Sequence, residues 1–165
     1  MYLILVSVLS FVTPAIQTAP DFSGTWTEDV SQRQTTYKTP TAGPKAMVAP
    51  DSDLVVKQTP ATLTSERTFM TQVIRYVFRL DGTESVNKNG ANTQTTKSHW
   101  DGNKLVTEGT SYSVTSQGES TWVYREVHSM NPKGQMVIEV TTTDEAGVKN
   151  VVTRVFRRKS TPGSR

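Results

Sequence analysis

The stretch that decides the fold is Asp21-Phe22-Ser23-Gly24-Thr25-Trp26. It places a glycine two residues before a tryptophan, at the start of a predicted strand over residues 22–30 and directly behind an apolar leader. Short segments rich in strand-forming residues then follow almost to the end of the chain. This stretch therefore predicts the first strand of an all-β protein.

The leader over residues 1–19 has the pattern of a signal peptide. Residues 1–20 carry no charged side chain, and the apolar run over residues 3–12 is about half of the roughly twenty residues that span a bilayer. Small residues precede two predicted cleavage points, after Ala15 or after Ala19. We expect a secreted or periplasmic protein without stable membrane insertion once the leader is removed. The alternative for this segment is a buried N-terminal strand.

Length and composition indicate one small domain. The chain has 165 residues, with 18 Lys and Arg against 15 Asp and Glu, and no cysteine. The absence of cysteine excludes disulfides, thiolate catalysis and cysteine-ligated zinc. The basic residues form no large clustered face, so no nucleic-acid binding is predicted. One local basic cluster occurs near the C-terminus, where a solvated strand end is the expected role: Arg154, Arg157, Arg158 and Lys159.

The remaining chain reads as one β domain over residues 20–159. A long loop is expected over residues 31–53, which contain three prolines, and a polar tail over residues 160–165. Further strands are predicted over residues 54–58, 62–69, 72–80, 93–100, 104–114, 120–130, 135–143 and 149–158. Asn-Gly, Asp-Gly and similar turn pairs separate most of them, as in successive hairpins. Because closure removes exposed edges, we predict an antiparallel up-and-down barrel of about eight to ten strands. A two-sheet β-sandwich is the alternative.

Four segments resemble bacterial secreted lipocalin-like proteins, which have calycin-type β-barrels. They are Phe22-Ser23-Gly24-Thr25-Trp26 with Asp29, Arg79-Leu80-Asp81-Gly82-Thr83-Glu84, the segment from His99 to Leu105, and the segment from Asn131 to Met136. The resemblance covers nearly all of the chain after the leader. It departs from lipocalins proper because no helix follows the last predicted strand and no disulfide ties the C-terminus.

The resemblance also implies a role for the opening motif. In lipocalins the Gly-x-Trp tryptophan closes the barrel floor, and an arginine of the last strand packs across it. This implies that Gly24 and Trp26 form the floor with Arg154, which shares a predicted strand face with Val152 and Phe156. An arginine over an indole gains a cation–π contact of about 0.5–2 kcal/mol.

Aromatic residues on alternating strand positions are the candidate lining of a ligand cavity. In residues 72–80, Ile74, Tyr76, Phe78 and Leu80 share one face and are expected to point inward. In residues 120–130, either the face with Trp122, Tyr124, Glu126, His128 and Met130 points inward, or the face with Val123, Arg125 and Val127 does. The candidate lining residues are Tyr76, Phe78, Trp100, Trp122, Tyr124 and His128.

These observations predict a binding protein for a small hydrophobic or amphipathic ligand. No Gly-x-Ser-x-Gly elbow, paired carboxylates or phosphate-binding loop is present, so we predict no enzymatic activity and no catalytic residue. His99 and His128 are the only histidines and lack metal-ligand spacing, so no metal and no cofactor are predicted. The alternative function is a ligand-free structural or protein-interaction barrel in the cell envelope. The sequence carries no signal for an oligomeric state.

Overall fold

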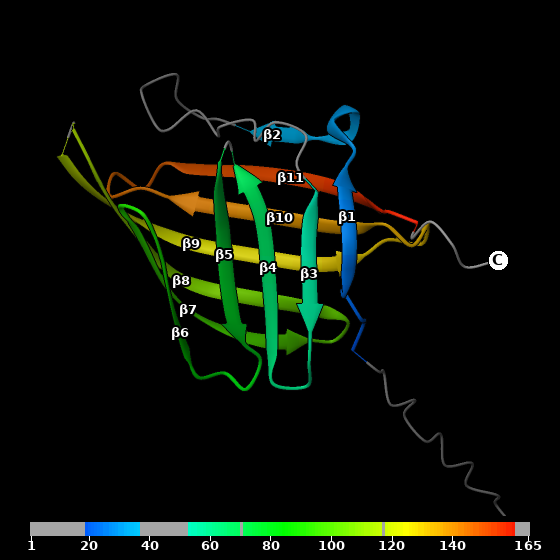
Figure 1. Ribbon diagram of the computed structural model, residues 1–165. Coiled ribbons are helices and arrows are strands. Elements are labelled where there is room, and N and C mark those ends of the chain that lie inside the picture. The colour runs from blue at the N-terminus through cyan, green and yellow to red at the C-terminus, as the bar shows by residue number, and fades with distance from the viewer. Residues whose placement is uncertain (1–18, 37–52, 70, 117, 161–165) are drawn as a thin grey trace, which may run out of the picture.

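The computed structural model describes residues 19–36, 53–69, 71–116 and 118–160, and these form one antiparallel β-barrel (Figure 1). The strands run in the spatial order β5-β4-β3-β1-β11-β10-β9-β8-β7-β6, and the short β2 pairs with β11 beside β1. Their bounds are β1 Gly24–Glu28, β2 Gln34–Thr36, β3 Leu54–Gln58, β4 Thr62–Phe69, β5 Gln72–Arg79, β6 Glu84–Asn89, β7 Asn92–Asp101, β8 Lys104–Thr115, β9 Gly118–Met130, β10 Met136–Thr143 and β11 Lys149–Arg158. The predicted all-β, antiparallel up-and-down barrel is confirmed.

The barrel consists of two crossed groups of strands. In Figure 1, β3, β4 and β5 lie across the front, and β7 to β11 run crosswise behind them. The strand β1 joins the two groups, because it pairs with β11 on one side and with β3 on the other. The ends of the order, β5 and β6, come together at the opposite side of the barrel and nearly close it.

Side chains rather than a backbone ladder close the gap between β5 and β6. Asn87 of β6 accepts a hydrogen bond from the Val77 amide at 2.8 Å and donates one to the Val77 carbonyl at 3.1 Å. Asn89 repeats this pattern with Arg75, at 3.3 and 3.1 Å, and Ser85 accepts from the Arg79 amide at 2.8 Å. We call this row of Ser85, Asn87 and Asn89 against β5 the side-chain seam. It satisfies backbone groups that would otherwise form two open sheet edges.

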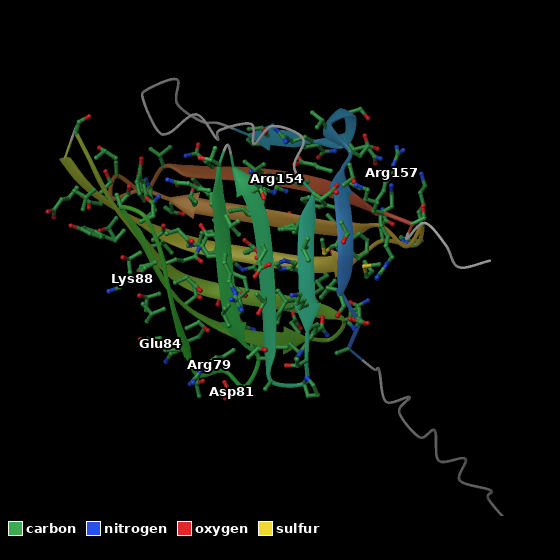
Figure 2. The ribbon with its side chains drawn as sticks, viewed as in Figure 1. Arg79, Asp81, Glu84, Lys88, Arg154 and Arg157 are labelled. Carbon is green, nitrogen blue, oxygen red and sulfur yellow. The ribbon has the colours of Figure 1, made fainter. Side chains whose placement is uncertain are left out.

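The strand β6 is absent from the sequence-based prediction, and the seam explains why. Its sequence, ESVNKN, is poor in the β-branched and aromatic residues that identify strands. Its serine and asparagines instead bond to the β5 backbone, a task that aliphatic side chains cannot perform. Its charged residues, Glu84 and Lys88, are exposed on the outer side of the barrel (Figure 2).

Replacing Asn87 by alanine is expected to lower the free energy of unfolding by about 1–3 kcal/mol, because the Val77 amide and carbonyl then lose their partner in a partly buried position. The Val77 amide should also exchange with deuterium faster, as amide hydrogen-exchange NMR would measure. Asn89→Ala is the matched control, because Asn89 makes the same pair of bonds at a more exposed site and should lose less. Equal losses in the two variants would contradict this account.

The apolar core fills one end of the barrel. Phe22 and Trp26 are completely buried there, with side chains from β3, β4, β5, β8, β10 and β11. The other buried members of this cluster are Leu54, Val56, Leu63, Phe78, Leu105, Met136, Ile138 and Phe156. The segment that carries the opening motif therefore plugs this end.

The regions outside the β-strands give two further results. The predicted loop over residues 31–53 contains the end of a 3-10 turn, Val30–Gln32, and β2, so its first part is structured. Residues 37–52, the predicted leader apart from residue 19, and residues 161–165 of the predicted tail lie outside the described residues. The leader and export stay predictions. Within the described residues, no helix has the length and apolar character needed to cross a bilayer.

Candidate functional site

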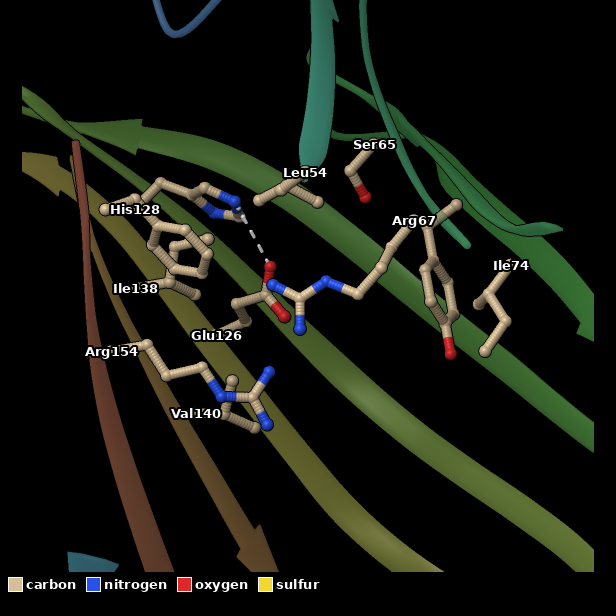
Figure 3. Close-up of a pocket in the computed structure, with 11 residues that line it drawn as sticks. Leu54, Ser65, Arg67, Ile74, Glu126, His128, Ile138, Val140 and Arg154 are labelled. Carbon is tan, nitrogen blue, oxygen red and sulfur yellow. Dashed lines mark ion pairs between the residues drawn. The ribbon is translucent and has the colours of Figure 1, made fainter. Parts of the chain in front are cut away.

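A cavity of about 260 Å³ lies inside the barrel beyond the apolar core (Figure 3). Side chains of β3, β4 and β5 form one wall, and side chains of β9, β10 and β11 form the facing wall. The lining residues are Leu54, Ser65, Arg67, Ile74, Tyr76, Glu126, His128, Ile138, Val140, Arg154 and Phe156. Most of this lining is apolar, but three formally charged side chains point into it.

The strand register builds each wall from residues that lie directly opposite one another. On the first wall, Arg67 of β4 pairs with Leu54 of β3 and with Ile74 of β5. On the second wall, Ile138 of β10 pairs with His128 of β9 and with Arg154 of β11. Paired residues point to the same face of a sheet, so each wall brings an arginine next to aliphatic side chains.

The two arginines are the cationic part of the cavity (Figure 3). Arg67 lies 3.8 Å from Glu28 and stacks 5.6 Å from the centre of the Phe156 ring. Burial and the nearby charge of Arg154 lower the pKa of the Arg67 guanidinium. No hydrogen bond or ion pair to Arg154 is found among the described residues, and its buried Nε has no partner. Arg154 therefore presents to the cavity a guanidinium that no side chain of the described residues bonds.

Three successive inward side chains of β9 gather around one carboxylate. The Tyr124 hydroxyl donates to Oε2 of Glu126, and Nε2 of His128 lies 3.3 Å from Oε1 of the same carboxylate. Burial lowers the pKa of His128, which favours the neutral imidazole, and Glu126 opposes this effect. Burial, reinforced by Glu126, raises the pKa of Tyr124 well above its ordinary value. The group holds Glu126 in place through both of its oxygens.

The structure places the six predicted lining residues in different surroundings. Tyr76 and His128 line the cavity. Phe78 is in the core and stacks on Tyr76 with ring centroids 6.1 Å apart, and Trp100 stacks on Phe22 at the same centroid distance. Trp122 and Tyr124 lie on the inward face of β9 without lining the cavity. The face of β9 that points inward is thus the one with Trp122 and His128.

Sequence reasoning missed both cationic side chains as cavity residues. A readable signal existed, because Arg154 lies between Val152 and Phe156 on a face expected to point inward, where an unpaired charge is costly. Arg67 occupies the corresponding kind of position on β4. It shares a predicted strand face with Leu63 and Phe69, so a similar but weaker signal was present there, interrupted by Ser65.

The prediction that Arg154 packs across Trp26 at the barrel floor is wrong, and the arginine that does so lies four residues later in the chain. Arg158, not Arg154, stacks over Trp26, with its guanidinium carbon 4.4 Å from the ring centre. The physical reason is the register, which pairs Trp26 with Arg158. Arg154 is on the same face, but it lies farther along β11 and lines the cavity instead. Gly24 has a φ of 135°, which residues with a Cβ rarely adopt, and it lies beside the Arg158 guanidinium.

Among the described residues, no group of three histidine, aspartate or glutamate side chains could hold a metal ion.

The predicted C-terminal basic cluster is divided among separate partners. Arg157 pairs with Asp29, and Lys159 lies 2.7 Å from Asp53.

Comparisons with known proteins identify the fold. No model of a protein family matches the sequence, and no curated protein matches it either. Among solved structures, a REP1-NXSQ fatty acid transporter aligns with a TM-score of 0.55 and 16% identity, covering 84% of this chain and 96% of that protein. Apo lipid binding protein 8 of Caenorhabditis elegans gives 0.58 and 12%, covering 84% and 95%. Human cRBP IV gives 0.53 and 16%, covering 85% and 99%. This chain therefore has the nearly closed antiparallel β-barrel of lipocalin-like, calycin-type proteins.

Proposed function

We propose that this barrel binds a small amphipathic ligand whose anionic head lies against Arg154 and whose apolar part lies along the aliphatic walls. The observation that carries the proposal is the Arg154 guanidinium, which faces the cavity without a hydrogen bond or ion pair among the described residues. Arg154 is half-buried and its Nε is buried. Removing a cation from water is costly unless it is paired, and a ligand carboxylate or similar anion would supply the pair. The fatty acid transporter and the lipid binding protein that share the fold support a binding role rather than a catalytic one.

The dimensions and lining of the cavity limit the ligand. Its volume of about 260 Å³ is just below the roughly 300–1,000 Å³ of pockets for drug-sized molecules, so a short or medium aliphatic chain suits it. Leu54, Ile74, Ile138 and Val140 offer such a chain an apolar surface. The alternative of a barrel filled by its own side chains has less support, because the core fills only one end.

Decanoate is expected to bind more tightly than decanol, and Arg154→Met should weaken decanoate binding by about 10- to 100-fold while changing decanol binding little. The reason is the loss of one charge-assisted interaction of about 1.5–3 kcal/mol. Displacement of an environment-sensitive fluorescent dye would measure both affinities. Arg125→Met is the matched control, because Arg125 lies on the outer face of β9, 2.9 Å from Glu108. Equal affinities of the wild-type protein for decanoate and decanol would contradict the proposal.

A further inference from the structure

The cavity contains a negative charge beside its two positive charges. Arg67, Arg154 and Glu126 all line it, and Figure 3 shows Glu126 facing the Arg67 guanidinium. Glu28 also approaches Arg67, but it lies closer to Arg33, at 2.7 Å. The three arginines and two glutamates of this group leave one positive charge among the described residues. His128 adds none when its buried imidazole is neutral.

Glu126 is held as a fixed charge at the cavity wall. The Tyr124 hydroxyl and His128 Nε2 contact its two oxygens, and all three residues lie on the inward face of the same strand. A ligand that enters the cavity would therefore meet the field of this carboxylate without displacing its partners. Such a field acts strongly at short range where water is excluded.

We propose that Glu126 determines which head-group charge the cavity accepts, and that it restricts the ligand to a single negative charge. A carboxylate or a sulfate ester matches the one surplus positive charge. A phosphate monoester, which carries nearly two negative charges at pH 7 or above, would leave its second charge unpaired beside the Glu126 carboxylate. This inference rests on the proposed function, because it assumes that the ligand head lies near Arg154.

Decyl sulfate and decyl phosphate at pH 8 provide a direct test, because the two probes share chain length and tetrahedral head shape but differ in charge. The wild-type protein is expected to bind decyl sulfate at least about 10-fold more tightly than decyl phosphate. Glu126→Gln keeps the side-chain shape and removes the charge, so it should reduce this ratio by about 10-fold. Glu139→Gln is the matched control, because Glu139 is exposed on the neighbouring strand β10, and it should leave the ratio unchanged.

The outcomes separate this inference from the proposed function. Equal wild-type affinities for the two probes would overturn the inference without any variant, even if Glu126→Gln failed to fold. A ratio that stays the same in a folded Glu126→Gln protein would also overturn it. In both cases, decanoate binding that depends on Arg154 would leave the proposed function standing. If neither decanoate nor the two probes bind, both proposals fail.

Discussion

Replacing Trp26 by alanine is expected to lower the free energy of unfolding by about 3–5 kcal/mol, the range for removing a large aromatic side chain from a core. Trp26 is completely buried, and its indole N–H donates to the Phe22 carbonyl at 2.9 Å. The substitution would open a cavity in the plugged end of the barrel and leave that carbonyl without its donor. Urea denaturation followed by circular dichroism would measure the loss.

Two further variants separate packing from the cation–π contact at Trp26. Trp26→Phe keeps an aromatic ring but loses the indole N–H, so it should cost less than Trp26→Ala. Arg158→Gln should cost about 0.5–1 kcal/mol, because Arg158 is exposed where it stacks over the ring. Trp122→Ala, at a partly exposed site, is the matched control and should cost less than Trp26→Ala. A loss below about 1 kcal/mol for Trp26→Ala would show that this residue does not hold the barrel end closed.

Gly109→Ala is expected to destabilise the protein by about 3 kcal/mol, at the upper end of the usual range for overpacking. A Cβ at Gly109 would lie 2.0 Å from the Thr95 carbonyl oxygen and 2.7 Å from the Thr96 Cα. Both are backbone atoms of β7, so no side-chain rotation could relieve the contact. The strands β7 and β8 would have to separate, and the ladder between Thr96 and Gly109 would weaken.

The control for Gly109 is a glycine that has a backbone requirement but no close neighbour. Gly90 has a φ of 60°, and a Cβ added there would meet no heavy atom within 4 Å beyond its chain neighbours. Gly90→Ala should therefore cost about 1–2 kcal/mol through backbone strain alone. Differential scanning calorimetry of the two variants would compare them. A melting temperature for Gly109→Ala equal to or above that of Gly90→Ala would contradict the steric argument.

The alternation of apolar and polar side chains within single strands could be recognised in the sequence, and it accounts for the inward-facing residues that were predicted correctly. Ile74, Tyr76 and Phe78 do point inward, because side chains of a strand alternate between its faces and the apolar set belongs inside. The turn pairs located the hairpins for the same reason, since their backbone requirements are local.

Pairing between distant strands was not readable, and it accounts for most of what was missed. Arg67 lies on β4 and Arg154 on β11, and both line one cavity only because the two groups of strands fold around it. Likewise, the face of β11 was predictable but its register against β1 was not, so Arg154 was assigned the contact that Arg158 makes. The strand β6 was not predicted, because its polar residues bond to the β5 backbone in the side-chain seam instead of packing in a core.

The pairing of β1 with β11 also has a kinetic consequence. Arg158 donates to the Ser23 carbonyl across 135 positions of sequence, because one of the two partners of the first strand is the last strand. Such a contact closes a very long loop, and folds dominated by distant contacts form slowly. During synthesis, β1 would lack its β11 partner, and Trp26 would lack the Arg158 side chain that stacks over it, until residue 158 had left the ribosome. We therefore expect that a chain truncated before β11 stays unfolded, which limited proteolysis would detect as rapid cleavage throughout the chain.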